Sequence, residues 1–112
     1  MLVAVYGSLK QGFGNNRLLS ASVLKGTDQT PPDYTMYSMG GFPCITEEPG
    51  TSIHIEVYEI DEEVFQRLDW LEGYPRFYNR KEIDTVYGTA WIYYIKDPDN
   101  LGHLNKVVDG EW

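Results

Sequence analysis

The chain has 112 residues, of which 42% are hydrophobic and 14% aromatic, and its formal net charge is −8. This length suits one domain spanning residues 1–112 with a single core. The acidic balance argues against nucleic acid and anionic membrane surfaces as partners, because both attract basic patches. We expect neither a signal peptide nor a transmembrane span, and the lone Cys44 cannot form an internal disulfide, which predicts a reducing, cytoplasmic setting.

The N-terminal segment changes character at Gly7. The apolar run over residues 2–5 predicts a largely buried strand. Gly7 then permits a sharp turn, after which the backbone amides of Ser8, Leu9 and Lys10 can point into one space. Clustered donors of this kind hold an anionic or carbonyl oxygen. The alternative is a glycine that only turns the chain after an edge strand.

Two phosphate-binding motifs do not fit this loop. Gly7 and Gly12 have the spacing that opens a P-loop, but Phe13-Gly14 stands where lysine and serine or threonine are needed. The dinucleotide fingerprint requires a different glycine spacing and a following βαβ unit. Nucleotide binding through this loop is therefore not expected.

The next elements are short. Residues 15–20 predict one or two helical turns with Asn15 as N-cap. Pro31-Pro32 marks a loop over residues 27–33, because paired prolines supply no donors to a sheet. Strands are expected on either side of it, over residues 22–26 and 34–39.

The middle of the chain carries the clearest periodicity. Pro49-Gly50 predicts a type II turn. Residues 53–58 alternate between apolar and polar positions, as a strand with one buried face does. Asp61 then predicts the N-cap of a helix that ends at Gly73, with an apolar stripe of Val64, Phe65, Leu68 and Leu71.

The C-terminal third predicts two further strands, over residues 78–86 and 86–95, the second of them central in the sheet, and a turn over residues 97–100. Several strands with one substantial helix indicate an α+β domain. Glycines and aromatic residues favour a curled sheet or small barrel. The predicted fold is thus a small mixed β-barrel with one main helix and a short N-terminal helix.

Glu72 is the strongest candidate for chemistry. It lies at the C-terminal end of the predicted helix, where the negative end of the helix dipole disfavours a carboxylate. Apolar neighbours, Trp70 among them, would raise its pKa further, and a carboxyl tuned toward neutrality suits proton transfer. The alternative is a solvated glutamate, paired with Arg76 or Arg80.

Other candidate sites are weaker. Cys44 with His54 or His103 could be drawn as a nucleophile pair, but nothing in the sequence brings them together, and a small buried thiol is the better interpretation of Cys44. Two histidines and one cysteine, widely separated, do not form a zinc pattern. The aromatic residues of segment 91–94 suit core packing better than base or sugar stacking.

Two segments carry a family resemblance. Tyr6-Gly7-Ser8-Leu9 follows an apolar strand, and segment 68–80 reads Leu-Asp-Trp-Leu-Glu-Gly-Tyr-Pro-Arg-Phe-Tyr-Asn-Arg. Together they resemble γ-glutamylcyclotransferase-like proteins, including those that act on γ-glutamylamines. Segments 56–61 and 110–112 agree with the same family, whereas Ile55 stands where its members usually have glycine and leaves the size of the substrate open.

The resemblance implies a metal-free and cofactor-free enzyme that releases 5-oxoproline and a free amine from a small γ-glutamyl amide or γ-glutamylamine. It implies Glu72 as the catalytic acid and base. A non-catalytic, stress-associated or binding member of the same fold is the alternative, and an unrelated β-rich interaction domain is a second. The leaving amine, the oligomeric state and the pathway are left open. The residues that the resemblance places at the substrate are Tyr6, Gly7, Ser8, Leu9 and Tyr78.

Overall fold

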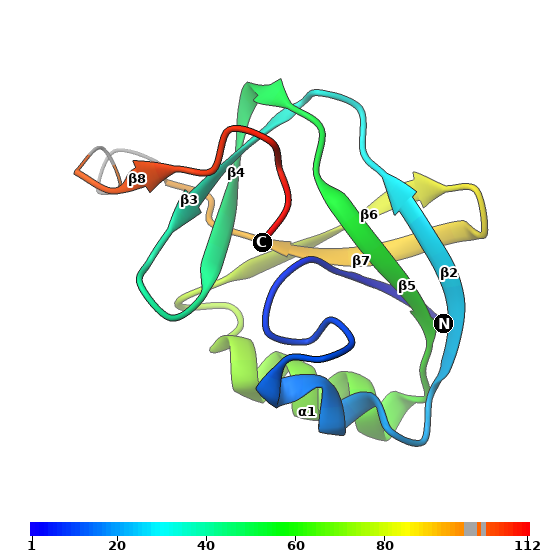
Figure 1. Cartoon of the computed structure of the whole chain (residues 1–112). Helices are drawn as coiled ribbons and strands as arrows, with labels where there is room; N and C mark the ends of the chain where they lie inside the picture. The colour runs from blue at the N-terminus through cyan, green and yellow to red at the C-terminus, as the bar shows by residue number, and fades with distance from the viewer. Residues whose placement is uncertain (98–100, 102) are drawn as a thin grey trace.

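Two β-sheets and one main helix form the protein in the computed structural model, which describes residues 1–97, 101 and 103–112 (Figure 1). The helices are the 3₁₀ helix η1 (Gly14–Leu19) and α1 (Glu62–Glu72). The strands are β1 (Leu2–Val5), β2 (Val23–Gln29), β3 (Tyr34–Ser38), β4 (Pro43–Thr51), β5 (His54–Glu59), β6 (Asn79–Thr85), β7 (Gly88–Tyr94) and β8 (Asn105–Lys106). The larger sheet has the order β2-β5-β1-β7-β6 and the smaller one the order β4-β3-β8.

Strand β1 lies at the centre of the larger sheet and is buried on both faces. It pairs antiparallel with β5 and parallel with β7. Val3 and Val5 belong to the core cluster that also holds the buried residues of α1, whereas Ala4 and Tyr6 belong to the cluster shared with the smaller sheet. This double burial explains why residues 2–5 are uninterruptedly apolar, and it confirms the predicted buried strand.

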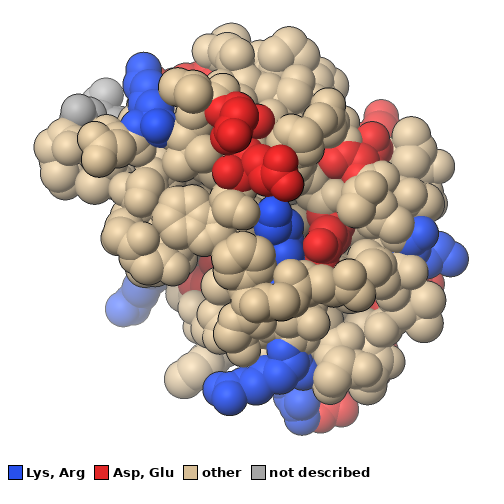
Figure 2. Space-filling model, viewed as in Figure 1, with Lys and Arg blue, Asp and Glu red and all other residues tan. Residues whose placement is uncertain are grey.

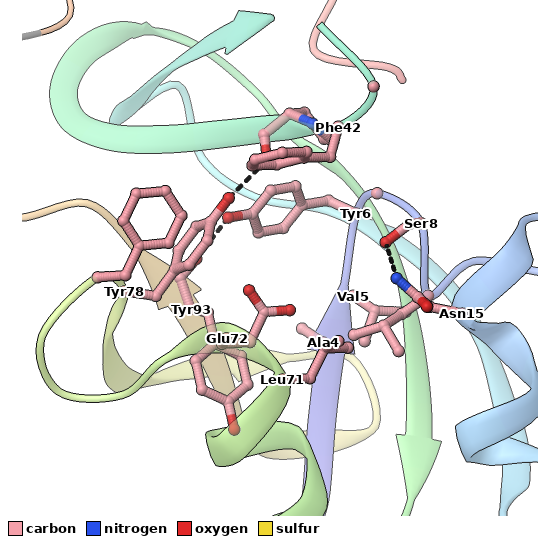
Figure 3. A pocket seen from close by; sticks show the side chains of 15 residues that line it. Ala4, Val5, Tyr6, Ser8, Asn15, Phe42, Leu71, Glu72, Tyr78 and Tyr93 are labelled. Atoms are coloured by element: carbon pink, nitrogen blue, oxygen red, sulfur yellow. Dashed lines mark hydrogen bonds between the residues drawn. The ribbon is translucent and has the colours of Figure 1, made fainter. Parts of the chain in front are cut away.

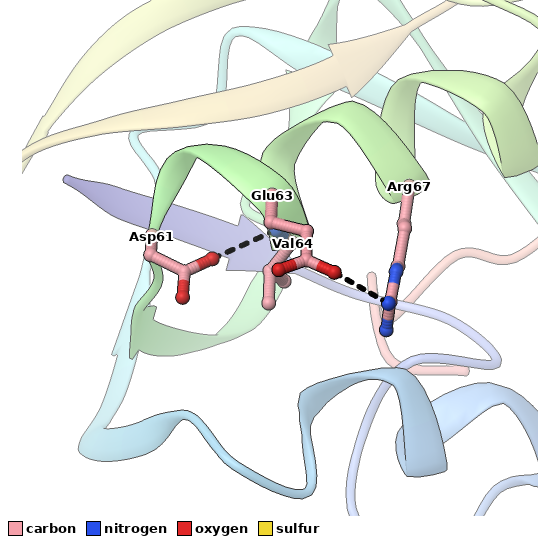
Figure 4. A network of polar contacts seen from close by, with 4 residues as sticks. All are labelled: Asp61, Glu63, Val64 and Arg67. Atoms are coloured by element: carbon pink, nitrogen blue, oxygen red, sulfur yellow. Dashed lines mark hydrogen bonds and ion pairs between the residues drawn. The ribbon is translucent and has the colours of Figure 1, made fainter.

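Helix α1 begins and ends as predicted. The Asp61 carboxylate accepts a hydrogen bond from the Val64 amide at 2.8 Å, which is the N-cap interaction (Figure 4). One turn on, Glu63 and Arg67 form an ion pair at 2.6 Å. Gly73 ends the helix with a φ of 65°, a left-handed conformation that favours glycine. No helix in the described part of the chain is long and apolar enough to cross a membrane.

The predicted α+β class is confirmed, but the predicted barrel is not closed. The two sheets pack over a shared core cluster, but within the described residues the only β-bridge between them is an isolated one that joins Thr46 and Ile95. Strands β2 and β6 consequently remain edge strands of the larger sheet. Strand β7 lies inside this sheet as predicted, although β1 and not β7 is its central strand.

The turn predicted at Pro49-Gly50 is wrong, because both residues lie within β4. Strand β3 pairs with β4 on either side of them, Thr35 opposite Thr46 and Tyr34 opposite Thr51, so residues 47–50 bulge out of the ladder. The Gly50 amide donates instead to the carbonyl oxygen of Pro32 at 2.9 Å. A pairing between distant segments has overridden a local turn signal.

Other local predictions differ in detail. Phe13, not Asn15, stands at the N-cap of η1, and it makes no side-chain cap bond. The second strand continues to Gln29, so the loop predicted from residue 27 begins at Thr30. The short β8 was not predicted, and the turn predicted over residues 97–100 lies outside the described residues except for Asp97.

Candidate active site

A pocket of about 280 Å³ lies where the turn after β1, the start of β4 and the end of α1 meet (Figure 3). Its volume suits a small molecule. Residues far apart in the sequence contribute to it because β1 runs beside β7 and the chain returns to α1 after Gly73. All six residues predicted at the site line this pocket: Tyr6, Gly7, Ser8, Leu9, Glu72 and Tyr78.

The turn after β1 presents two free backbone donors. The Lys10 amide closes the turn by donating to the Gly7 carbonyl oxygen at 2.9 Å, so it is not available to a ligand, contrary to expectation. No hydrogen bond in the described structure uses the amides of Ser8 or Leu9. Asn15 of η1 holds the turn in place through two hydrogen bonds. Its backbone amide donates to the Ser8 carbonyl oxygen at 3.0 Å, and its side-chain Nδ2 donates to the Ser8 hydroxyl at 2.8 Å.

Gly7 is required for space and not for an unusual backbone angle. It is not among the glycines with positive φ. A β-carbon at this position would lie 2.8 Å from two ring carbons of Pro43, closer than side chains approach. Gly7 therefore allows the turn to pack directly against the start of β4, which forms another wall of the pocket.

Glu72 is the last residue of α1, and its carboxyl group points into the pocket (Figure 3). Burial raises its pKa to about 7. Trp70 does not contribute to this burial, because 86% of its surface is exposed, and the apolar lining near the helix end comes from Leu71 and Phe77. A carboxyl group with this pKa both accepts and donates protons near neutral pH.

The predicted alternative of an ion pair at Glu72 is not found among the described residues. Nε of Arg80 lies 3.0 Å from Oδ1 of Asp69, in a geometry that does not complete a hydrogen bond. The Arg80 guanidinium also stacks over Tyr74 at 4.3 Å from the ring centroid. Arg76 is exposed and lines no part of the pocket. In the part of the chain that the structure describes, no cation therefore lowers the pKa of Glu72.

Three buried tyrosines line the pocket with Glu72, and each hydroxyl donates to another acceptor. Tyr6 donates to the carbonyl oxygen of Tyr93 at 2.7 Å, Tyr78 to that of Pro43 at 2.8 Å, and Tyr93 to Oδ1 of Asp69 at 2.7 Å. None of these protons stabilises an ionised Glu72. Burial, and after it the charges of neighbouring groups, raises the pKa of both Tyr6 and Tyr78, so both phenols stay neutral at physiological pH.

Backbone hydrogen bonds explain the spacing between Glu72 and Tyr78. The Phe77 amide donates to the Gly73 carbonyl oxygen at 2.8 Å, and the Tyr78 amide donates to the Glu72 carbonyl oxygen at 3.2 Å. The segment after α1 thus folds back on the helix end. This return places the Tyr78 ring beside the pocket that Glu72 enters.

The structure gives no support to a cysteine nucleophile or a metal site. Burial raises the pKa of the free Cys44 thiol to about 11, which disfavours the reactive thiolate. His54 lies on the surface against Gln29. Over residues 1–97, 101 and 103–112, no group of three or more histidine, cysteine or acidic residues could hold a metal ion.

Asn15 and Tyr93 also line the pocket, although sequence reasoning had assigned them to a helix cap and to the core. The position of Asn15 directly after the glycine-rich loop was the one signal that could have indicated contact with it. The place of Tyr93 in the pocket follows from the register of β7 beside β1, and no local sequence pattern reveals that register.

Comparison with known proteins decides the family. Residues 3–112 match the family model described as gamma-glutamyl cyclotransferase, AIG2-like. The chain belongs to this family. A Vibrio cholerae relative is 40% identical over 111 residues, which cover 99% of this chain and 94% of the relative. The gamma-glutamylcyclotransferase family protein YtfP of Escherichia coli is 36% identical over 112 residues, covering 100% of this chain and 96% of its own.

Solved structures of the gamma-glutamyl cyclotransferase, AIG2-like family share the fold. The solution structure of E. coli YtfP superposes with a TM-score of 0.77 at 34% identity and covers 100% of this chain and 96% of its own. The crystal structure of an AIG2-like protein from mouse gives a TM-score of 0.81 at 20% identity, covering 96% of this chain and 86% of its own. The resemblance seen in the sequence is confirmed at the level of family and fold.

Proposed function

We propose that this protein is a cyclotransferase that releases 5-oxoproline and a free amine from a small γ-glutamyl amide or γ-glutamylamine. One observation carries the proposal: the Glu72 carboxyl lines the same pocket as Ser8 and Leu9, whose backbone amides are unused. A proton carrier and oxyanion donors are the two components that intramolecular acyl transfer needs.

In the proposed reaction the α-amino nitrogen of the substrate attacks its own γ-carbonyl carbon. A carbon–nitrogen bond forms in the new five-membered ring, and the bond to the leaving nitrogen breaks. The α-ammonium nitrogen gives up two protons. Glu72 carries one of them to the leaving nitrogen, and the other ends on the released amine, which is protonated at neutral pH. No oxidant, reductant or metal is required for this balance.

The pocket supplies geometry as well as proton transfer. The glutamyl chain is flexible, so holding its nitrogen against its own carbonyl carbon lowers the barrier by removing that freedom beforehand. In this proposal the Ser8 and Leu9 amides hold the substrate carboxylate or the developing oxyanion. Tyr6 and Tyr78, fixed through their hydroxyls, form rigid walls that favour the folded chain.

The deciding experiment compares a γ-glutamyl amide with its N-acetylated form. Both are incubated with the protein while 5-oxoproline and the released amine are measured. We expect 5-oxoproline from the free compound and no turnover of the acetylated one, since the acetyl group blocks the attacking nitrogen. Equal consumption of both would indicate ordinary hydrolysis. Binding without turnover of either would identify a non-catalytic member of the family.

A further inference from the structure

A second hollow of about 490 Å³ lies beside the pocket, between η1 and α1. We call it the η1–α1 groove; Arg17 and Leu18 line it from η1, and α1 contributes Glu63, Gln66, Arg67 and Trp70. Asn15 and Leu71 line both the groove and the pocket, so the two spaces are adjacent and meet at these side chains. A molecule too long for the pocket would therefore extend into the groove.

The groove combines an exposed aromatic surface with an unbalanced positive charge. Trp70 is 86% exposed and Leu71 is 38% exposed, although both are large apolar side chains. Arg67 is neutralised by Glu63 at 2.6 Å. Arg17 forms no side-chain hydrogen bond or ion pair with the rest of the described chain. Figure 2 shows basic side chains at the lower edge, where Figure 1 places η1 and α1, with an acidic side chain beside them and further acidic side chains gathered above.

We propose that the η1–α1 groove binds the leaving-group part of the substrate, and that it selects a leaving group with an apolar or aromatic body and a carboxylate. This inference rests on the proposed function. The glutamyl part lies in the pocket with its reacting carbonyl near Glu72, and the leaving group passes between Leu71 and Asn15. Its apolar body packs on Trp70, and its carboxylate pairs with Arg17.

The charge of the groove excludes the opposite class of substrate. A polyamine leaving group would bring further positive charge next to Arg17, and Glu63, the one carboxylate among the described residues that line the groove, is already paired with Arg67. Small neutral amines would leave the groove empty and gain nothing from Trp70. The groove therefore distinguishes among γ-glutamyl compounds that share the same reacting bond.

The test measures kcat/KM for 5-oxoproline formation with three compounds. These are γ-glutamylphenylalanine, its neutral carboxamide, and γ-glutamylmethylamide, whose leaving group is too small to reach the groove. We expect the wild-type protein to prefer the acid over the carboxamide by about fivefold, as for a partly exposed ion pair. Arg17→Gln should bring this ratio close to one, and Trp70→Ala should lower kcat/KM for both phenylalanine compounds about tenfold.

Arg76→Gln is the matched control, because Arg76 is an exposed arginine that lines neither the pocket nor the groove. It should leave the ratio unchanged. If Arg17→Gln keeps the wild-type ratio of acid to carboxamide and Trp70→Ala keeps the wild-type kcat/KM for the phenylalanine compounds, while the methylamide yields 5-oxoproline, the groove proposal fails and the proposed function stands. If no compound yields 5-oxoproline, both fail. Sedimentation of Trp70→Ala completes the test: a dimer that dissociates with unchanged substrate ratios would assign the groove to a second copy of the chain and overturn the proposal.

Discussion

Arg80 pairs with Asp69, and Glu72, one helical turn further on, has no cationic partner among the described residues. The Nε atom of Arg80 lies 3.0 Å from Oδ1 of Asp69, and its guanidinium stacks within 4.6 Å of three aromatic ring centroids. Asp69 also accepts the hydroxyl proton of Tyr93 at 2.7 Å. The carboxylate that supports the structure and the carboxyl proposed for proton transfer are thus separate side chains with separate surroundings.

Glu72→Gln should abolish most activity. Glutamine keeps the shape of the side chain but cannot carry a proton, and loss of a general acid or base costs about 10²- to 10⁴-fold in rate. Turnover is measured as 5-oxoproline release. Glu62→Gln, at the opposite end of the same helix, serves as control and should keep normal turnover. Near-normal turnover of Glu72→Gln would show that another residue carries the proton.

The same variant should change how stability depends on pH. The pKa of Glu72 is about 7 in the folded protein and close to the ordinary value of 4.5 in the unfolded chain. The folded state therefore binds more protons between these values, and the wild-type protein loses stability as pH rises from 4.5 to 7. Glu72→Gln removes this loss. Its thermal midpoint should exceed that of wild type by more at pH 8 than at pH 4.5. The same difference in thermal midpoint at both pH values would contradict the raised pKa of Glu72.

Gly7→Ala should disturb the pocket through packing. Its β-carbon would lie 2.8 Å from ring carbons of Pro43, and such overpacking costs about 1–3 kcal/mol. We expect a lower midpoint in urea and a higher KM, because the turn that carries the Ser8 and Leu9 amides must shift. Gly14→Ala is the control, since nothing lies within 4 Å of its added carbon. Equal stability of the two variants would show that the contact with Pro43 is easily relieved.

Arg80→Lys should loosen the C-terminal end of α1. Lysine keeps the charge but loses the planar group that stacks between rings, at a cost of about 1 kcal/mol. Urea unfolding measures the loss, and a fall in kcat that exceeds the change in KM would indicate displacement of Glu72. Arg76→Lys, exposed and outside the stack, should match wild type in both measurements.

Activity should persist in excess chelator. The reaction proposed here moves one proton through Glu72 and closes a ring, which no metal needs to assist. The measurement is 5-oxoproline release before and after prolonged dialysis against a chelator. Loss of turnover that a divalent ion restores would count against the mechanism.

The elements defined by local chemistry were predictable from the sequence. Asp61 and Gly73 bound α1 through capping, which depends on neighbours within one turn. The alternation over residues 53–58 marked the buried face of β5 in the same way, with Ile55 and Val57 both buried. These signals arise within a few residues and survive any change in the rest of the fold.

Features that depend on distant pairing were not predictable. Pro49-Gly50 has the composition of a turn, yet β3 holds both ends of the segment in one ladder. Trp70 was expected near Glu72 because the two are neighbours in sequence, but a helix points residues two apart in different directions. The pocket residues of the β1 turn and of segment 68–80 were grouped through the family resemblance, since no periodicity connects them.

The central position of β1 has a consequence for synthesis. Its two partners, β5 and β7, follow it by more than fifty and more than eighty residues. Until the ribosome has released β7, one edge of this apolar strand has no partner, and the Tyr6 hydroxyl has no acceptor at Tyr93. An open apolar edge is a template for pairing with other chains. The segment that forms the pocket is therefore made first but cannot complete its pairing until β7 has been made, and in an unfinished chain its open edge favours aggregation.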